Sequence, residues 1–215
     1  MKNLQFDDKL FSQFRRPTGK QGKTIAAIMN KEHDQLTNWG LSHIKIEPNS
    51  AILDIGVGGG RTIGKLANLA FEGNVYGIDY SRDMVDFTKT QNQQLTAHGR
   101  VNLVQASVEA LSFCAGFLDL VIAVETIYFW PNLINAFCEI NRVLKQGGKF
   151  VIISEMTKDG KYEVENAEII AKTHVKLYSL AELQGLLEAA GFCVEVSRKQ
   201  GSAWNVIVAQ KTIQG

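Results

Sequence analysis

Hydrophobic positions along this chain form short apolar runs that alternate with amphipathic stretches. The runs predict buried strands over residues 51–55, 74–79, 101–106, 119–124 and 149–154. Helical spacing between the runs predicts helices over 61–70, from Ser81 to about 97, and over 132–144. Ser81 is expected to cap the second of these helices, and Gly147 and Gly148 are expected to end the third.

Alternating strands and helices favour right-handed parallel crossovers and a sheet covered on both faces. The pattern changes after residue 154, where a helix over 180–190 is followed by strands over 193–197 and 204–210. A short turn around Gly201 joins these two strands, so we expect them to be antiparallel. The sequence therefore predicts a doubly wound, Rossmann-like α/β fold. Its seven-stranded sheet is mostly parallel, with an antiparallel C-terminal edge pair.

Composition excludes several classes of protein. The chain has 215 residues, of which 45% are apolar and 21% charged, as in ordinary globular domains. A net charge of +1 gives no bulk attraction to nucleic acid or to a membrane. No apolar run resembles a signal peptide or a membrane span, so we expect a cytoplasmic protein, as a monomer or a homodimer. The three cysteines are too far apart for a zinc site or a disulfide framework, and we expect them to be buried.

Charge is uneven along the chain. Residues 1–31 contain seven lysines and arginines against two aspartates, which gives this segment a local charge of +5. One interpretation is a solvated surface. The other is a lid that attracts an anionic substrate.

The most informative segment is a glycine-rich turn, ILDIGVGGGRT, after the first predicted strand. Gly56, Gly58 and Gly60 let the backbone turn sharply and let a ligand approach closely. The third glycine of the dinucleotide pattern G-x-G-x-x-G would fall on Arg61. Asp54, just before the glycines, would repel a pyrophosphate but could hold an ammonium group, directly or through water. S-adenosylmethionine (SAM) carries an ammonium and a sulfonium and no phosphate.

A second acidic residue ends the next predicted strand. Asp79 follows Gly56 by 23 positions, where a carboxylate can accept hydrogen bonds from two ribose hydroxyls. The alternative is an ordinary capping aspartate before Ser81. The position at the strand end and the upstream glycine turn favour the ribose role.

With these motifs in their order and spacing, the sequence resembles the class I SAM-dependent methyltransferases over residues 48–155. The matching stretches are ILDIGVGGGRT, VYGIDYS, VNLVQASVEALSF, LDLVIAVETIYFW and INRVLKQGGKFVI. The resemblance implies that the three glycines line the methionine part of SAM and that Asp79 holds the ribose. It also implies that Tyr80 packs beside the adenine. Met84 is a further adenine candidate, although a core methionine fits its spacing equally.

One position departs from the family pattern. Many members carry an aspartate after the third strand that accepts the adenine amino group, and here Ser107 stands in its place. A serine hydroxyl can still accept that bond, and the backbone of Val108 can serve adenine N1. Weaker binding is one consequence of the change to serine, and Glu109 as an additional candidate contact is the alternative.

The acceptor end is less clearly defined by sequence. By resemblance, Glu125 lies near the methionine end of SAM, and Tyr128 and Trp130 are candidates for lining the acceptor pocket. The N-terminal segment 1–45 resembles a cap over the active site of the domain 46–215, and the polar insert 157–178 is a candidate lid. These segments bring His33 and His174 as further pocket candidates. No general base and no metal ligand are identified.

The residues thus predict a SAM-dependent methyltransferase that methylates a small molecule by in-line displacement and releases S-adenosylhomocysteine. A non-catalytic SAM-binding or regulatory protein shares the same pocket. An NAD-dependent oxidoreductase and a nucleic-acid methyltransferase are weaker alternatives. A P-loop nucleotide hydrolase is disfavoured, because the Gly22-Lys23-Thr24 ending lacks the required first glycine, for which Pro17 stands instead.

Overall fold

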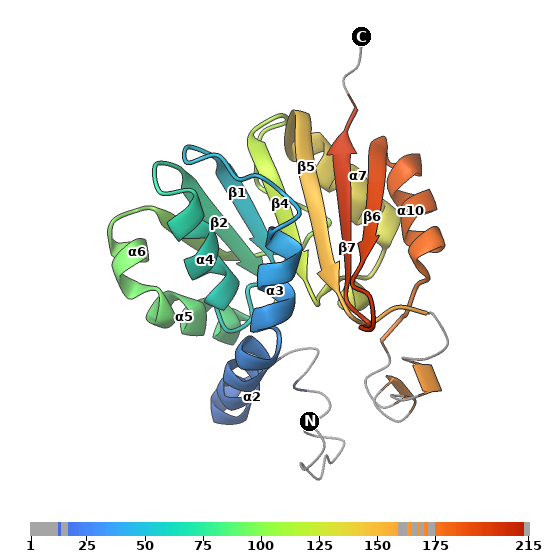
Figure 1. Cartoon of the computed structure of the whole chain (residues 1–215). Coiled ribbons are helices and arrows are strands. Elements are labelled where there is room, and N and C mark those ends of the chain that lie inside the picture. Colours follow the sequence, from blue (N-terminus) through green and yellow to red (C-terminus); the bar gives the residue numbers. More distant parts are fainter. Residues whose placement is uncertain are drawn as a thin grey trace.

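A single seven-stranded sheet organises the chain (Figure 1). The computed structural model describes Gln13, 17–158, 163–164, Ala167, 170–171 and 175–212. The strands are β1 (Ala51–Ile55), β2 (Asn74–Asp79), β3 (Val101–Gln105), β4 (Leu118–Val124), β5 (Leu144–Ser154), β6 (Phe192–Arg198) and β7 (Asn205–Lys211). The helices are α2 (Gly19–Glu32), α3 (Asp34–Leu41), α4 (Arg61–Leu69), α5 (Arg82–Gln91), α6 (Gln93–Ala97), α7 (Leu133–Val143), α10 (Leu180–Ala189) and the 3₁₀ turn η1 (Ile127–Phe129).

Strand order confirms the predicted fold class. The order is β3-β2-β1-β4-β5-β7-β6, in which β1 lies between β2 and β4 and runs parallel to both. β7 runs antiparallel to β5 and to β6, as the turn near Gly201 predicted. The sheet order reverses between β1 and β4, and ligands of open α/β sheets bind at the carboxyl ends of strands beside such a point.

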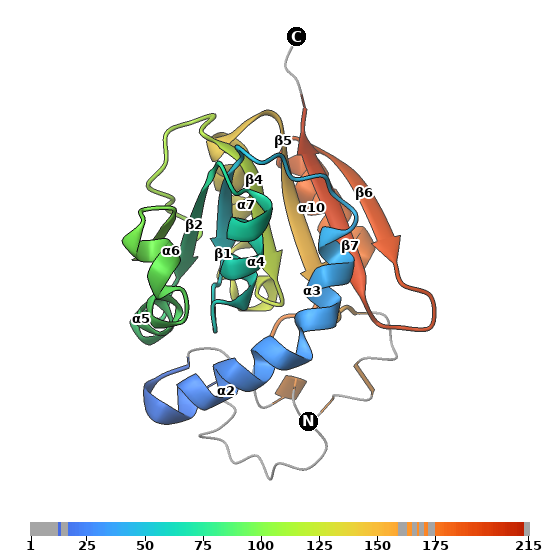
Figure 2. The same ribbon diagram turned by 60° about the vertical axis from the view of Figure 1, so that its left-hand side comes forward.

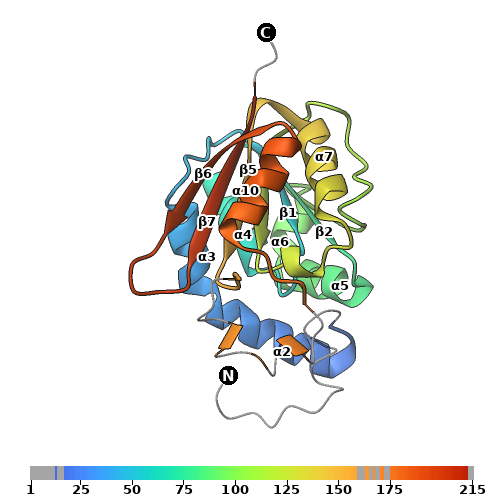
Figure 3. The same ribbon diagram turned by 90° about the vertical axis from the view of Figure 1, so that its right-hand side faces the viewer.

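Both faces of the sheet are covered by helices (Figures 1 and 3). Successive residues of one strand point to opposite faces, so Leu53 packs with α7 and α10 while Ile52 packs with α3 and α4. Both side chains are fully buried. The apolar strands are therefore buried on both sides, as expected of a doubly wound parallel sheet.

The helix predicted from Ser81 to about residue 97 is two helices, α5 and α6, which meet at Asn92. The Asn92 side chain donates to the Gly60 carbonyl oxygen (3.0 Å), so this break reaches the glycine turn. Ser81 precedes α5 but does not cap it through its side chain. Its hydroxyl donates instead to the Pro17 carbonyl oxygen (2.7 Å) and attaches the segment before α2 to the sheet edge.

The predicted end of the helix over 132–144 was also wrong. α7 ends at Val143, and β5 begins at once at Leu144, which pairs with Leu118 of β4. Gly147 and Gly148 therefore lie inside β5, near the register shift of its pairing with β4. Apolar residues at the end of a helix and the start of a strand look alike in sequence, which is why the boundary was misplaced.

The N-terminal helical region consists of α2 and α3, which meet at His33. α3 packs on the sheet through Gly40, where an added Cβ would lie 2.6 Å from the Ile153 side chain. α2 continues past the carboxyl ends of the strands (Figure 2). The bend at His33 therefore places α2 across the edge of the sheet where a ligand is expected.

Cys114, Cys138 and Cys193 are exposed free thiols, so the prediction of buried cysteines was wrong. Cys138 lies on the solvent side of α7, and Cys193 on the edge strand β6. None of the helices in the described part of the chain combines the length and the hydrophobicity of a membrane span.

Candidate active site

A cavity of about 710 Å³ lies at the carboxyl ends of β1, β2 and β4, beside α2. Its size falls in the range of cofactor and small-molecule sites. It is lined by ten of the residues predicted from sequence: His33, Gly56, Gly58, Asp79, Tyr80, Met84, Ser107, Val108, Glu125 and Trp130. The chain thus brings residues from five separate segments to one site.

The glycine turn forms one wall of the cavity. Gly56 has a φ of 81°, and an added Cβ would lie 2.4 Å from the Thr126 hydroxyl oxygen. Gly58 has a φ of 46°, and the nearest atom to an added Cβ would be the Gly56 carbonyl oxygen at 3.9 Å. Gly56 is therefore required by packing within the protein. Gly58 leaves open space on the side of the cavity.

Gly60 has a different role from the one predicted. It is the left-handed N-cap of α4 and does not line the cavity. A Cβ there would lie 2.8 Å from the Thr88 methyl and 2.9 Å from the Asn92 amide. Gly60 thus lets α5 approach α4, while its neighbour Gly59 borders the cavity beneath Asn30 of α2.

Asp79 connects the glycine turn to the start of α5. Its Oδ2 accepts the Gly58 N–H (3.1 Å) and its Oδ1 accepts the Ser81 N–H (2.8 Å). Burial raises the pKa of Asp79, and these two backbone hydrogen bonds oppose the rise. Each carboxylate oxygen keeps capacity for another donor. Asp79 can therefore hold the turn in place and accept hydrogen bonds from a ligand.

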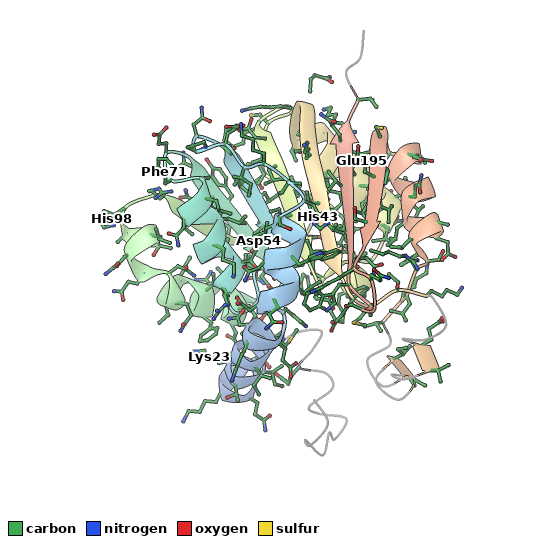
Figure 4. The ribbon with its side chains drawn as sticks, viewed as in Figure 1. Lys23, His43, Asp54, Phe71, His98 and Glu195 are labelled. Atoms are coloured by element: carbon green, nitrogen blue, oxygen red, sulfur yellow. The ribbon has the colours of Figure 1, made fainter. Side chains whose placement is uncertain are left out.

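Asp54 lies behind the turn rather than on the cavity wall. It is 1% exposed and does not line the cavity, so a direct contact with a ligand is not supported. Burial, together with the nearby Asp79 charge, raises the pKa of Asp54 to about 7. Among the described residues, its Oδ2 has no hydrogen-bond partner. The base of the turn therefore carries an acidic group, Asp54. A cationic ligand bound at the turn would favour the ionised form of this group. Figure 4 labels Asp54 in the interior of the sheet.

Residues from the segments after β2 and β3 border another part of the cavity. Tyr80 is 65% exposed and borders the cavity together with Ser107 and Val108. Met84 is fully buried, as a core methionine is, and it also borders the cavity. The Ser107 hydroxyl accepts the Glu109 N–H at 3.3 Å, so it is oriented by its own loop.

Glu125 marks the opposite end of the cavity. Its φ of 52° is rare for a residue with a side chain and forms the sharp turn from β4 into η1. Its Oε1 accepts the Tyr128 hydroxyl (2.9 Å) and the Glu155 N–H (2.6 Å). Burial, followed by the charge of Glu155, raises the pKa of Glu125 to about 8.

Tyr128 does not line the cavity, contrary to the prediction. Its ring is 4% exposed and lies in the hydrophobic core between the sheet and α7. Only its hydroxyl points toward the site, where it holds Glu125. Trp130 does line the cavity and stacks on Phe150 of β5, with ring centroids 6.2 Å apart.

Two histidines were predicted to line the pocket, and one of them, His33, lies in the part of the chain that the structure describes. His33 lies at the α2–α3 junction and lines the cavity, and burial lowers the pKa of its imidazole. The neutral ring is therefore favoured. His174 lies outside the described residues.

Two polar connections attach α2 and α3 to α4 and α5. Asp34 contacts Arg61 and pairs with Lys65 (2.8 Å), which come from α4 after the glycine turn. The Gly19 N–H donates to Asp83 of α5 (2.8 Å). Sequence analysis missed Asp34, Arg61 and Lys65 as cavity residues, because no local motif links positions this far apart.

Comparison with known proteins identifies relatives over the same region. A family model described as a methyltransferase domain matches residues 53–152. The chain is 30% identical over 125 residues to the uncharacterized methyltransferase YdaC of Bacillus subtilis, covering 58% of this chain and 67% of that protein. Other curated methyltransferases are matched over a smaller share of their own length, for example 32% of one and 64% of another.

Solved structures share the fold over nearly the whole chain. A SAM-dependent methyltransferase from Aquifex aeolicus superposes with a TM-score of 0.70 at 19% identity, covering 96% of this chain and 99% of that one. The methyltransferase in a complex with the Haloferax volcanii Trm112 activator gives a TM-score of 0.78 at 18% identity, covering 94% and 98%.

Proposed function

Because this chain belongs to the class I SAM-dependent methyltransferases and uses SAM as its cofactor, we propose that it methylates a small-molecule acceptor. The acceptor lies between α2 and the segment after β4. The products are the methylated acceptor and S-adenosylhomocysteine.

The residues of the glycine turn fit this cofactor. Gly58 leaves open space where a side chain would meet a ligand, and Asp79 has oxygens available for ribose hydroxyls. The unpartnered Asp54 carboxyl favours a ligand that carries positive charge and disfavours a pyrophosphate. These features support SAM more than a dinucleotide at this site.

Bound SAM supplies a methyl group activated on a sulfonium. The contribution of the protein is then orientation and exclusion of water. Asp79 and the glycine turn fix the nucleoside end, and Ser107 and Val108 border the adenine side. Glu125 and the Trp130 ring border the opposite end, where the acceptor would approach.

Coverage of the cavity by α2 is the observation that carries the proposed acceptor class. Met29, Asn30 and His33 of this region line the cavity together with Trp130 after β4. A macromolecular substrate would have to approach past α2, whereas a small molecule fits in a cavity of this size. The position of α2 beside the cavity therefore favours a small acceptor.

Release of S-adenosylhomocysteine from SAM tests the proposal. The full chain is incubated with SAM and either a small-molecule extract or purified RNA and protein fractions. We expect release with the small-molecule extract in the parent and in Asp86→Ala, a substitution on the exposed face of α5. We expect none in Asp79→Ala. Release only with RNA or protein would overturn the acceptor class, and tight SAM binding without any release would favour a non-catalytic role.

A further inference from the structure

Three side chains with metal-ligating atoms meet at the acceptor end of the cavity. His33 lies at the α2–α3 junction, Glu125 directly follows β4 and Glu155 directly follows β5. One ligand atom from each lies within 4.8 Å of the other two. Because β4 and β5 are adjacent parallel strands, the two glutamates meet at one edge of the sheet, and the helical bend brings the histidine over them.

The spacing of these atoms suits a single ion. Transition-metal ions bind imidazole nitrogen and carboxylate oxygen at about 2.0–2.2 Å, so ligands of one ion lie at most about 4.4 Å apart. The observed upper limit of 4.8 Å requires only a small inward movement of the side chains.

Two of the three side chains, Glu125 and His33, have ligand atoms that the protein leaves available, whereas the Glu155 carboxylate is hydrogen-bonded to the Trp204 side chain. Glu125 is 8% exposed, and its two hydrogen bonds both go to Oε1. In the part of the chain that the structure describes, Oε2 of Glu125 has no hydrogen-bond partner, and neither do the ring nitrogens of His33. Both residues line the cavity. These atoms are accessible from the cavity, so they are available to an ion that enters it.

The charge of the group indicates a cation. Two carboxylates close together in a partly buried space repel one another, and a bound divalent cation offsets that repulsion. One imidazole with two carboxylates combines a ligand typical of zinc and iron with ligands typical of manganese. Mg²⁺ and Ca²⁺ prefer oxygen ligands alone.

We propose that His33, Glu125 and Glu155 form a binding site for a divalent first-row transition metal ion, with Mn²⁺ as the best match to this ligand set. Three protein ligands leave coordination positions open toward the cavity. An oxygen atom of the acceptor takes one of these positions, which orients the acceptor beside the methyl group. The role of the ion rests on the proposed function, whereas binding of the ion does not.

The site is tested by titrating Mn²⁺ into the chelator-treated full chain and measuring free Mn²⁺ by electron paramagnetic resonance. We expect one Mn²⁺ site per chain in the parent. In Glu155→Gln and in His33→Gln, the affinity for Mn²⁺ should be weaker than that of the parent by about tenfold or more. The matched controls are His43→Gln and Glu195→Gln, two exposed residues labelled in Figure 4, which should bind as the parent does. Thermal unfolding without metal verifies that all variants are folded.

Two results would overturn the site. One is a folded parent that binds neither Mn²⁺ nor Zn²⁺, and the other is a pair of variants that bind Mn²⁺ as firmly as the parent. Release of S-adenosylhomocysteine is a separate measurement. An enzyme that turns over but binds no metal rejects the metal site alone, and an inactive chain that binds Mn²⁺ rejects the proposed function alone.

Discussion

The two ends of the cavity are built in different ways. At the glycine turn, backbone N–H groups and left-handed glycines form the wall, and the Asp79 oxygens are hydrogen-bonded to that backbone. At the acceptor end, side chains of His33, Glu125 and Glu155 converge from distant segments. Their ligand atoms are only partly satisfied by the protein.

This difference shows how one scaffold can keep a cofactor while changing its acceptor. A wall of backbone atoms depends on chain conformation, which is set by a short local sequence. A wall of side chains changes with each substitution and with the cap that covers it, and specificity often resides in such segments over a fixed scaffold. The predictions below test whether the two ends are separable.

The largest expected effect comes from two neighbouring glycines. Gly58→Ala places a methyl group toward the cavity and should weaken binding of S-adenosylhomocysteine about 100-fold, the equivalent of about 2.8 kcal/mol. In Gly60→Ala the added methyl group would instead clash with Thr88 and Asn92. This variant should therefore destabilise the fold, with little effect on the affinity of the folded protein for S-adenosylhomocysteine. Calorimetric titration and thermal unfolding of both variants measure the contrast. Equal affinities for the two variants would mean that the turn does not contact the ligand through Gly58.

Asp54→Asn should weaken binding of S-adenosylhomocysteine but raise the free energy of unfolding at pH 8. The folded-state pKa of Asp54 is raised to about 7, above an ordinary value of 3.8, so the folded chain retains a proton that the unfolded chain loses. Its contribution to stability is therefore present below about pH 4 and is lost as pH rises toward 7. The variant should lose this part of the pH dependence and should bind S-adenosylhomocysteine about tenfold more weakly, as expected for loss of a charge worth about 1.4 kcal/mol.

Unfolding free energies at pH 4 and pH 8, with and without ligand, measure both effects of Asp54→Asn. An unchanged pH profile would show that Asp54 is ionised in the free protein. An unchanged affinity would show that its charge does not reach the ligand.

The smallest expected effect concerns the attachment of the cap. Arg61 and Lys65 lower the pKa of Asp34, so its contribution to stability is present above an ordinary pKa of 3.8 and is lost as pH falls further. Because these side chains are partly exposed, Asp34→Asn should cost about 1 kcal/mol or less at pH 7. Chemical denaturation at pH 7 and pH 3 measures it, with Asp86→Asn as the control on α5. A loss of several kcal/mol would mean that the cap is part of the folding core.

The end of the cavity at the glycine turn could be predicted from sequence because its determinants are local. The glycine turn, Asp79 and Tyr80 follow strand ends, and strand ends are visible as the boundaries of apolar runs. Sequence could not distinguish Gly58 from Gly60, because one faces the cavity and the other faces α5. It misplaced Tyr128 because an aromatic residue after a strand fits the core and the pocket equally well.

The acceptor end could not be assembled from sequence. His33 and Glu155 are 122 positions apart, and only the bend between α2 and α3 brings them together. The contacts of Asp34 with Arg61 and Lys65 depend on the same bend. Tertiary packing, rather than any local pattern, determines this half of the site.

Binding of S-adenosylhomocysteine to Asp79→Ala and to the parent tests the central claim most directly. If the carboxylate after β2 accepts the ribose hydroxyls, two hydrogen bonds to a charged group are lost, and affinity should fall about 100-fold or more. Isothermal titration calorimetry on both proteins, with NAD as the competing ligand, gives the answer. Retention of the parent's affinity by folded Asp79→Ala, or tight binding of NAD by the parent, would contradict the account.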